Sequence, residues 1–374
     1  MRYDISKLST KVLLSPVVAA TAALVRLDER VARSSIKEGW IARAHFGDAV
    51  ASVWLDGELV LLEDLVLHDA AADVRTPTHE LTIAREVLRT RRKIAEQPPG
   101  WALSSEGLAM LRGGTTPRYV ATASTDLSVC IDATSTAGPI TAREGGSNFD
   151  VLEKELADMD AVLARSAEVL SGVAAPKVPL GSDRSPLVYE PDWNEDERLE
   201  EWRATLVETE QMPPLLRAVI LLDAWDALVV LEHGRWLGRL LAASLLREVG
   251  IATCHLPALN VGLKSVARDR RTRPDPNSRI LALLEAICAA ADTGLREHDR
   301  LLLARQQLQH RLHGRRQNSK LPQLIELVLA RPMVSSGMIA GELGVTPQGA
   351  LKIARELNLR ELTGRGRFRA WGIV

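Results

Sequence analysis

The sequence predicts a mainly α-helical protein with one small β-hairpin near its C-terminal end. Of its 374 residues, 46% are hydrophobic and 25% are charged, which is typical of a soluble chain that buries a core. Aromatic residues make up only 4%, and most of them are Trp. Because strands favour aromatic and β-branched residues, this composition argues against a β-sandwich or barrel, and the abundance of Ala, Leu and Arg favours helices.

Residues 1–100 are predicted to form an N-terminal helical region. A mostly helix-forming run covers 22–40, and Thr78 is a good N-cap for a helix that starts at His79. Residues 101–186 follow as an irregular or linker region, because Thr, Ser and Gly dominate much of it. We expect a short strand near 119–131 and one helix over 149–170 there.

Residues 187–318 are predicted to form a helical core. The segment 213–250 is almost continuously apolar, with a pause at Glu232-His233-Gly234, so it should be buried on several sides. Two further helices are expected over 278–291 and 295–312. Four Trp residues in predicted helices are interpreted as core residues: Trp40, Trp54, Trp202 and Trp225.

The two parts of the chain carry opposite net charges. From Lys264 to the end there are 20 Lys and Arg against 10 Asp and Glu, so this part carries +10 and the preceding 263 residues carry −11. Such an asymmetry indicates that the C-terminal part meets a polyanion. The alternative is that Arg-rich helices simply solvate their outer faces.

The most specific pattern lies in a module predicted to span residues 319–374. A helix-turn-helix needs a small residue in its first helix and a turn residue that tolerates positive φ. Ala340 and Gly344 meet these needs, and Thr346-Pro347 is a strong start for the second helix. The apolar residues expected to hold the two helices together are Ile339, Leu343, Val345, Ala350 and Ile353.

Two short strands are expected after this pair of helices, over 359–362 and 368–371. The segment between them has a basic tip, so the module is predicted to be a winged helix-turn-helix that binds double-stranded DNA. Gln348 would bind a base edge. The expected phosphate contacts are Thr346, Lys352, Arg355, Arg365, Arg367 and Arg369. A winged helix that makes protein contacts or dimerises is the alternative.

Several segments of the central region are spaced like the core of Fic-domain proteins. They are PLLRA at 214–218, WD at 225–226, GRLL at 238–241 and LPAL at 256–259. Upstream, SSIKEG at 34–39 resembles the inhibitory motif of that family. Fic-domain proteins are helical enzymes that move the nucleotide part of ATP onto a hydroxyl of a target protein, and a C-terminal winged helix is common among them. The combination also resembles a bacterial family of unknown function with a DNA-binding end.

The Fic signature, H-P-F-x-[D/E]-G-N-G-R-x-x-R, is broken in this chain. When Arg239 takes the last position, Leu228 falls on the histidine that acts as general base, and leucine cannot accept the proton. The resemblance therefore implies a catalytically degenerate Fic-like scaffold. The alternative is a protein nucleotidyltransferase with a rearranged site, in which His233 is the base, Glu232 holds Mg²⁺ and Arg239 binds phosphate.

The resemblance also implies an ion pair within the chain. In the family, the glutamate of the inhibitory motif pairs with the last arginine of the signature. The corresponding residues here are Glu38 and Arg239. We expect them to form a structural pair that ties the N-terminal helix to the core.

No cofactor or metal is expected. His310 and His313 stand at i and i+3 but lack a third ligand, and no phosphate-binding glycine loop or H-E-x-x-H motif occurs. The three cysteines have no C-x-x-C spacing, which favours a reducing cytoplasm. The N-terminal apolar stretch is broken and ends in charges, so neither a signal peptide nor a membrane span is expected.

These patterns together favour a DNA-binding regulator of transcription or of a replicon. Because winged-helix proteins commonly bind paired half-sites, we expect it to act as a homodimer. The alternatives are the nucleotidyltransferase described above and an antitoxin-like module that binds a protein partner.

Overall fold

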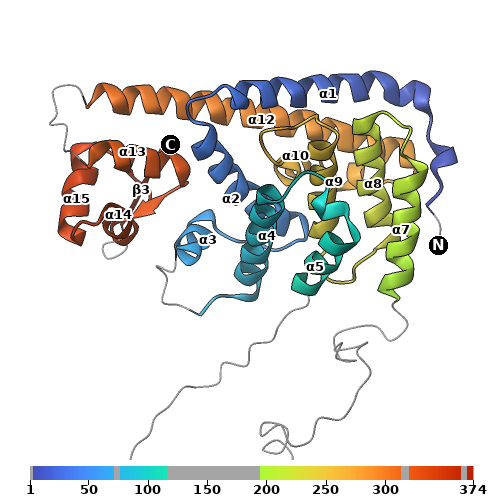
Figure 1. The fold of residues 1–374 in the computed structure, drawn as a ribbon, viewed down its shortest axis with the longest axis horizontal. Helices are drawn as coiled ribbons and strands as arrows, with labels where there is room; N and C mark the ends of the chain where they lie inside the picture. The colour runs from blue at the N-terminus through green and yellow to red at the C-terminus, as the bar shows by residue number, and fades with distance from the viewer. Residues whose placement is uncertain (1–2, 71–75, 116–193, 313–319, 364–368, 374) are drawn as a thin grey trace, which may run out of the picture. The chain divides into compact units, whose positions relative to one another are not determined.

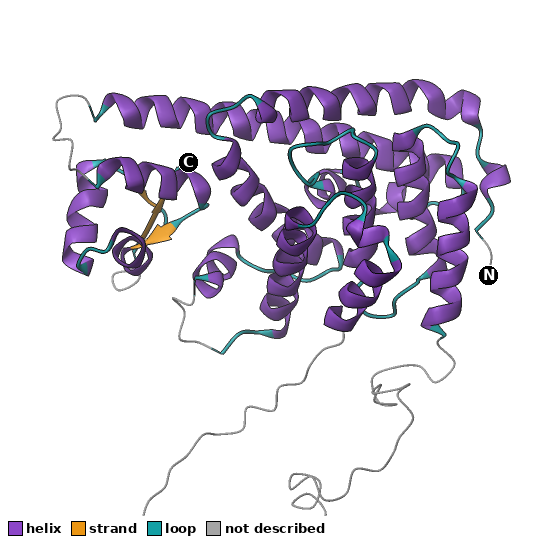
Figure 2. Ribbon diagram, viewed as in Figure 1, coloured by secondary structure: helices purple, strands orange, loops and turns teal. Residues whose placement is uncertain are grey.

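A computed structural model of the chain describes residues 3–70, 76–115, 194–312, 320–363 and 369–373. Helices account for most of these residues, and the strands among them form one small sheet (Figures 1 and 2). The predicted mainly α fold class is therefore confirmed. The strand expected near 119–131 and the helix expected over 149–170 lie outside the described residues.

The described segments belong to one compact unit, which covers Met1–Pro117 and Trp193–Val374. Its first elements are η1 (Ile5–Lys7), α1 (Thr10–Ala32), α2 (Lys37–Leu55), α3 (Leu62–Asp69), α4 (His79–Glu96), η2 (Trp101–Leu103) and α5 (Ser105–Thr115). The central elements are α7 (Glu195–Glu208), α8 (Pro214–Leu228), α9 (Trp236–Glu248), α10 (Leu259–Ser265), α11 (Arg268–Arg271) and α12 (Pro276–His310). The last elements are α13 (Leu321–Ala330), β1 (Val334–Ser335), α14 (Ser336–Leu343), α15 (Pro347–Glu356), β2 (Arg360–Glu361) and β3 (Ala370–Gly372).

Helices α1 and α12 lie side by side along one edge of the unit (Figure 1). The prediction of two helices over 278–291 and 295–312 is wrong, because α12 continues without a break through Gly294. A Cβ atom at Gly294 would lie only 2.8 Å from Leu27 and 3.1 Å from Trp40, and the Gly294 carbonyl accepts a 3.0 Å hydrogen bond from the Trp40 indole. Tertiary packing therefore keeps a glycine inside the helix.

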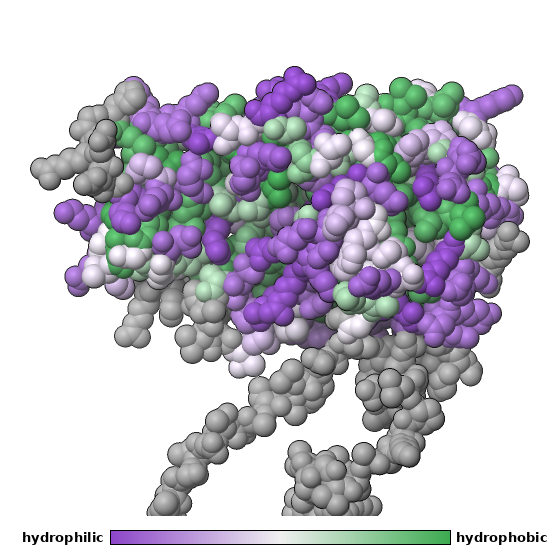
Figure 3. Space-filling view, viewed as in Figure 1, coloured by the Kyte–Doolittle hydropathy of each residue, from purple (hydrophilic) through white to green (hydrophobic). Residues whose placement is uncertain are grey.

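Helix α1 combines a buried face and an exposed apolar face. It is long and apolar enough to cross a bilayer by length and composition, but a core helix of a soluble protein passes the same test. On its outer side Leu14 and Val18 are 56% and 60% exposed. Hydrophobic residues accordingly reach the surface along the upper edge of Figure 3, where α1 lies. The absence of a membrane span stays a prediction.

The helix-forming run over 22–40 breaks between α1 and α2. The Ser34 hydroxyl accepts a hydrogen bond from the Ile36 backbone N–H at 3.3 Å, and a 2.8 Å hydrogen bond joins it to the buried His298 of α12. The segment that resembles an inhibitory motif therefore forms a helix junction packed on α12.

Helices α8 and α9 are buried on several sides, as the segment 213–250 predicts. The rings of Trp202 and Trp225 meet edge to face at 5.2 Å, and both are fully buried. The predicted pause corresponds to the turn between the two helices. Trp54 differs from the prediction: it is 40% exposed, with the Lys264 ammonium 5.2 Å from its ring centroid.

A buried polar network joins α2, α4 and the segment before α10. The Asp48 carboxylate accepts hydrogen bonds from Arg91 at 2.5 Å and from the Asn260 backbone N–H at 2.8 Å. Arg91 also donates to the carbonyl oxygens of Leu256 and Pro257. Because the carboxylate and the guanidinium are both nearly inaccessible, their charges depend on these partners.

Candidate nucleic-acid interface

The C-terminal helix pair is built from strong local signals. The Ser335 hydroxyl caps α14 by accepting a 3.2 Å hydrogen bond from the Met338 N–H. Gly344 ends the helix with φ of 63°, in the left-handed region that favours glycine. The Thr346 hydroxyl then caps α15 by accepting from the Gly349 N–H at 3.1 Å, and Pro347 occupies the first turn. The predicted turn chemistry is therefore confirmed.

The two helices bury the side that the sequence assigns to the core. Of the predicted residues, Ile339, Leu343 and Ala350 are buried, whereas Val345 and Ile353 are partly buried against the core; Ala354 of α15 is buried as well. Val345 in the turn donates its N–H to the Ala340 carbonyl at 3.1 Å, which closes the turn over the predicted small residue. This packing fixes which face of α15 remains accessible.

The accessible face of α15 carries the polar and basic residues predicted for DNA contact. Gln348, Lys352 and Arg355 are all exposed, and their spacing of four and three residues places them on one side of the helix. Thr346 is exposed at the N-terminal end, where backbone N–H groups favour an anion. The structure thus brings four of the predicted contact residues together on one element.

The strands flank the helix pair in the sequence, β1 before it and β2 and β3 after it, and they form a three-stranded antiparallel sheet in the order β1-β3-β2. β2 and β3 are the predicted wing strands, and β1 is an additional strand whose Val334 lies opposite Trp371. Arg369 is exposed and lies 3.6 Å from the Glu361 carboxylate. Arg365 and Arg367 lie outside the described residues.

Arg360 is a further exposed cation of this sheet that the sequence reasoning did not single out. It stands in β2 opposite Gly372, one residue before Glu361. Its place in the expected strand over 359–362, close to the basic tip, could have indicated it.

The winged helix is attached to the body through Arg43 of α2. This buried guanidinium donates to the carbonyl oxygens of Val328 at 3.0 Å and Arg331 at 2.7 Å, at the end of α13. Burial lowers the pKa of Arg43 to about 10, so it stays charged at neutral pH. Its Nε lies 3.3 Å from Glu297 of α12, which also pairs with Arg300 at 2.7 Å. No pattern in the sequence indicated this attachment.

The predicted ion pair of Glu38 and Arg239 is wrong. Arg239 donates to the Asp56 carboxylate at 2.8 and 3.1 Å and to the Ser52 hydroxyl at 3.0 Å, whereas Glu38 is exposed in the first turn of α2. The neighbouring Gly39 serves packing, because a Cβ there would lie 3.2 Å from the Leu329 backbone of α13.

The residues of the alternative transfer site lie at the α8–α9 turn or close to it. Leu228, at the position of the missing general base, is a buried core residue. His233 is exposed, and the Oε2 atom of Glu232 is buried without a hydrogen-bond partner in the described residues. Arg239 is turned to Asp56. The structure therefore keeps the Arg239 guanidinium engaged within the protein.

One cluster in the described residues offers three ligand types that metals use: Asp28, Cys254 and His255, whose candidate atoms lie within 4.8 Å of one another. Asp28 accepts hydrogen bonds from the Thr253 hydroxyl at 2.7 Å and the Cys254 thiol at 3.1 Å. Burial and the bond to Asp28 raise the pKa of Cys254 to about 12, so the thiol keeps its proton at neutral pH. In the structure, Asp28 stabilises the turn at residues 253–255 through these hydrogen bonds. A metal ion would have to displace the proton of the Cys254 thiol to bind there. His313, which stands three residues after His310, lies outside the described residues.

Comparisons with known proteins match two parts of the chain to described families. Residues 187–313 match a family described as a protein of unknown function (DUF1612), and residues 321–374 match one described as an HTH DNA binding domain. The chain is 50% identical over 380 residues to the uncharacterized protein y4cF of Sinorhizobium fredii (strain NBRC 101917 / NGR234), covering all of both chains. The predicted helix-turn-helix is thereby confirmed.

Proposed function

The chain belongs to the same family as the rhizobial protein y4cF and ends in a helix-turn-helix DNA-binding domain, and on this premise we propose that it is a regulator of transcription or of a replicon. Its target is double-stranded DNA, bound by α15 and the wing. Because DNA is its partner, the proposed place of action is the cytoplasm.

The accessible face of α15 is the observation that carries this proposal. The helix buries Ala350 and Ala354 and presents Gln348, Lys352 and Arg355 to solvent. A glutamine there can donate to and accept from an adenine edge in the major groove, whereas the two cations contact phosphates. The phosphate backbone of the DNA on either side is proposed to contact Thr346, Arg369, Arg365 and Arg367.

Fluorescence anisotropy of labelled duplex DNA, titrated with the full-length protein at several salt concentrations, tests the proposal. We expect Lys352→Ala and Arg355→Ala each to weaken binding several-fold and to reduce the slope of log affinity against log salt by about one. Lys11→Ala removes an exposed cation of α1 and is the matched control, which should bind as the wild type does.

Two results would contradict the proposal. The first is a wild-type protein that fails to bind DNA at about 100 mM salt. The second is a pair of α15 variants whose affinity and salt slope equal those of the control. Either result would favour the protein-interaction function, in which the winged helix contacts a protein partner.

The proposal includes a homodimer, because two copies of one winged helix read a site with two-fold symmetry. The stoichiometry of the DNA complex, measured by light scattering, should be two chains per duplex.

We propose no nucleotide transfer at the α8–α9 region, because the ion pair with Asp56 already engages the Arg239 guanidinium. Stable protein labelling by ATP and Mg²⁺ that is lost in His233→Ala would overturn that assignment.

A further inference from the structure

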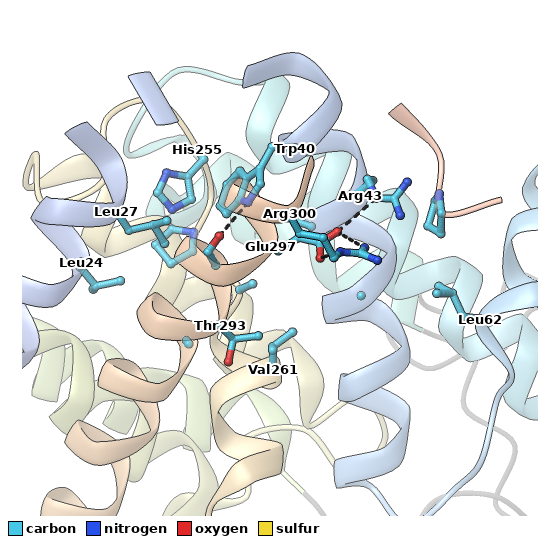
Figure 4. Close-up of a pocket in the computed structure, with 17 residues that line it drawn as sticks. Leu24, Leu27, Trp40, Arg43, Leu62, His255, Val261, Thr293, Glu297 and Arg300 are labelled. Atoms are coloured by element: carbon cyan, nitrogen blue, oxygen red, sulfur yellow. Dashed lines mark hydrogen bonds and ion pairs between the residues drawn. The ribbon is translucent and has the colours of Figure 1, made fainter. Parts of the chain in front are cut away.

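A cavity of about 280 Å³ lies in the body between α1, α2, α10 and α12 (Figure 4). Its wall is mostly apolar: Leu24, Leu27, Trp40, Leu62, Pro257 and Val261 are among the lining residues. Such a lining with few polar groups is typical of small-molecule sites. Gly47 of α2 also lines it, and a Cβ atom at Gly47 would meet nothing within 4 Å.

His255 supplies a polar side chain at this wall, and one of its two ring nitrogens is unpaired among the described residues. Its side chain is 98% buried beside the ring of Trp40, with the two ring centroids 5.2 Å apart. The Nδ1 atom lies 2.9 Å from the Asp28 carboxylate, whereas Nε2 has no hydrogen-bond partner in the described residues. A buried polar atom without a partner is costly unless something fills its hydrogen-bonding capacity.

The partner of Nδ1 fixes what Nε2 can do. Burial alone would raise the pKa of Asp28, but hydrogen bonds from His255, Thr253 and Cys254 outweigh burial and hold the pKa well below its usual range. Because an ionised carboxylate only accepts, Nδ1 carries the hydrogen. In the neutral imidazole, Nε2 is then an acceptor and suits a ligand that donates a hydrogen bond.

The other end of the cavity reaches the attachment of the winged helix. Arg43, Glu297 and Arg300 line it, and so does Pro332, which follows α13 (Figure 4). Arg43 donates to the carbonyl oxygens of Val328 in α13 and of Arg331 just after it, and Arg300 donates to the Ile373 carbonyl after β3 at 3.1 Å. A molecule in the cavity therefore touches the side chains that hold the DNA-binding module.

We propose that this cavity binds an uncharged, largely apolar small molecule that donates one hydrogen bond to His255, and that its occupancy changes the affinity of the winged helix for DNA. The second half of this inference rests on the proposed function, and the first half does not. The two sites are coupled because the ligand contacts Arg43, which holds the end of α13, and DNA binds the module to which α13 belongs.

Calorimetric titration of the full-length protein with indole tests the ligand site directly. Indole is an apolar bicyclic molecule with one N–H donor, and 1-methylindole has the same rings without the donor. We expect the wild type to bind indole, and to bind 1-methylindole about tenfold more weakly because His255 stays unsatisfied. Gly47→Leu fills the cavity and should abolish binding.

Gly113→Leu is the matched control, because Gly113 is also a helical glycine with nothing within 4 Å of a Cβ. It should bind indole as the wild type does. If Gly47→Leu fails to fold by circular dichroism, Val261→Phe fills the same cavity from α10. The proposed ligand site would be wrong if the wild type releases or absorbs no heat of binding with millimolar indole. It would also be wrong if the cavity-filling variants bind indole as the wild type does.

The coupling is measured separately by repeating the DNA titration with saturating indole. We expect the DNA affinity to change about fivefold or more in the wild type and in Gly113→Leu, and to stay constant in Gly47→Leu. Indole binding with an unchanged DNA affinity would overturn the coupling alone. A protein that binds indole but not DNA would contradict the proposed function and leave the ligand site intact.

Discussion

At the scale of single residues, the fold decides which groups pair with each charged side chain. The sequence offers Glu38 as a partner for Arg239, but α2 carries Asp56 and Ser52 to the guanidinium instead. These residues stand in the last turn of α2 and at its end, and Glu38 stands in the first. A motif comparison cannot find the true partner, because the choice depends on which turn of α2 packs against α9.

His45 makes the stability of the protein depend on pH. Burial, and then the charges of Arg91 and Arg92, lower the pKa of His45 to about 3. The unfolded chain, with an ordinary histidine pKa near 6.5, therefore binds the proton first as the pH falls. Stability is fully present above about pH 6.5 and decreases toward pH 3.

Urea unfolding at pH 7 and pH 5 measures this effect. The free energy of unfolding should fall by about 2 kcal/mol more in the wild type than in His45→Gln, which cannot take up the proton. Equal falls in the two proteins would show that His45 is not the titrating group.

At the scale of elements, the sequence predicts those features that depend only on neighbouring residues. The α14–α15 turn was predictable because Gly344 and Thr346-Pro347 act on their own neighbours. The single helix α12 was not, because Leu27 and Trp40, far away in the sequence, pack on Gly294. The candidate DNA face followed from helical spacing, whereas Arg43 and the cavity depend on contacts between distant segments.

The crossing of α8 and α9 gives an element-scale prediction. A Cβ atom at Gly238 would lie 2.2 Å from the Trp225 ring, which is itself held against Trp202. Neither indole can move aside without leaving a cavity behind it. Gly238→Ala should therefore lower the free energy of unfolding by about 1–3 kcal/mol.

Thermal unfolding of both glycine variants checks this expectation. Gly47→Ala is the control: it also places a methyl group on a helical glycine, but in open space. Its free energy of unfolding should equal that of the wild type or exceed it by up to about 1 kcal/mol, because alanine favours helices more than glycine does. Gly238→Ala with the stability of Gly47→Ala would contradict the close packing of the two helices.

At the scale of the whole molecule, Arg43 links the body to the DNA-binding module. Its side chain is 7% exposed, and its guanidinium bonds to Val328 and Arg331 of the module and to Glu297 of the body. Arg43→Met keeps much of the apolar stem and leaves these three acceptors without the donor. The loss should cost on the order of 3 kcal/mol, because two carbonyl oxygens lose their donor and the half-buried Glu297 keeps only Arg300 as a charged partner.

Hydrogen exchange distinguishes a loosened module from a generally weakened protein. In Arg43→Met, the amides at the end of α13 and in β3 should exchange faster, while those of α8 and α9 keep their wild-type rates. Arg33→Met, at an arginine that is 82% exposed and pairs only with Glu29 in the described residues, should leave all of these rates unchanged. Unaltered exchange in α13 would show that other contacts hold the winged helix, and a ligand in the cavity would then have no route through Arg43 to the DNA-binding face.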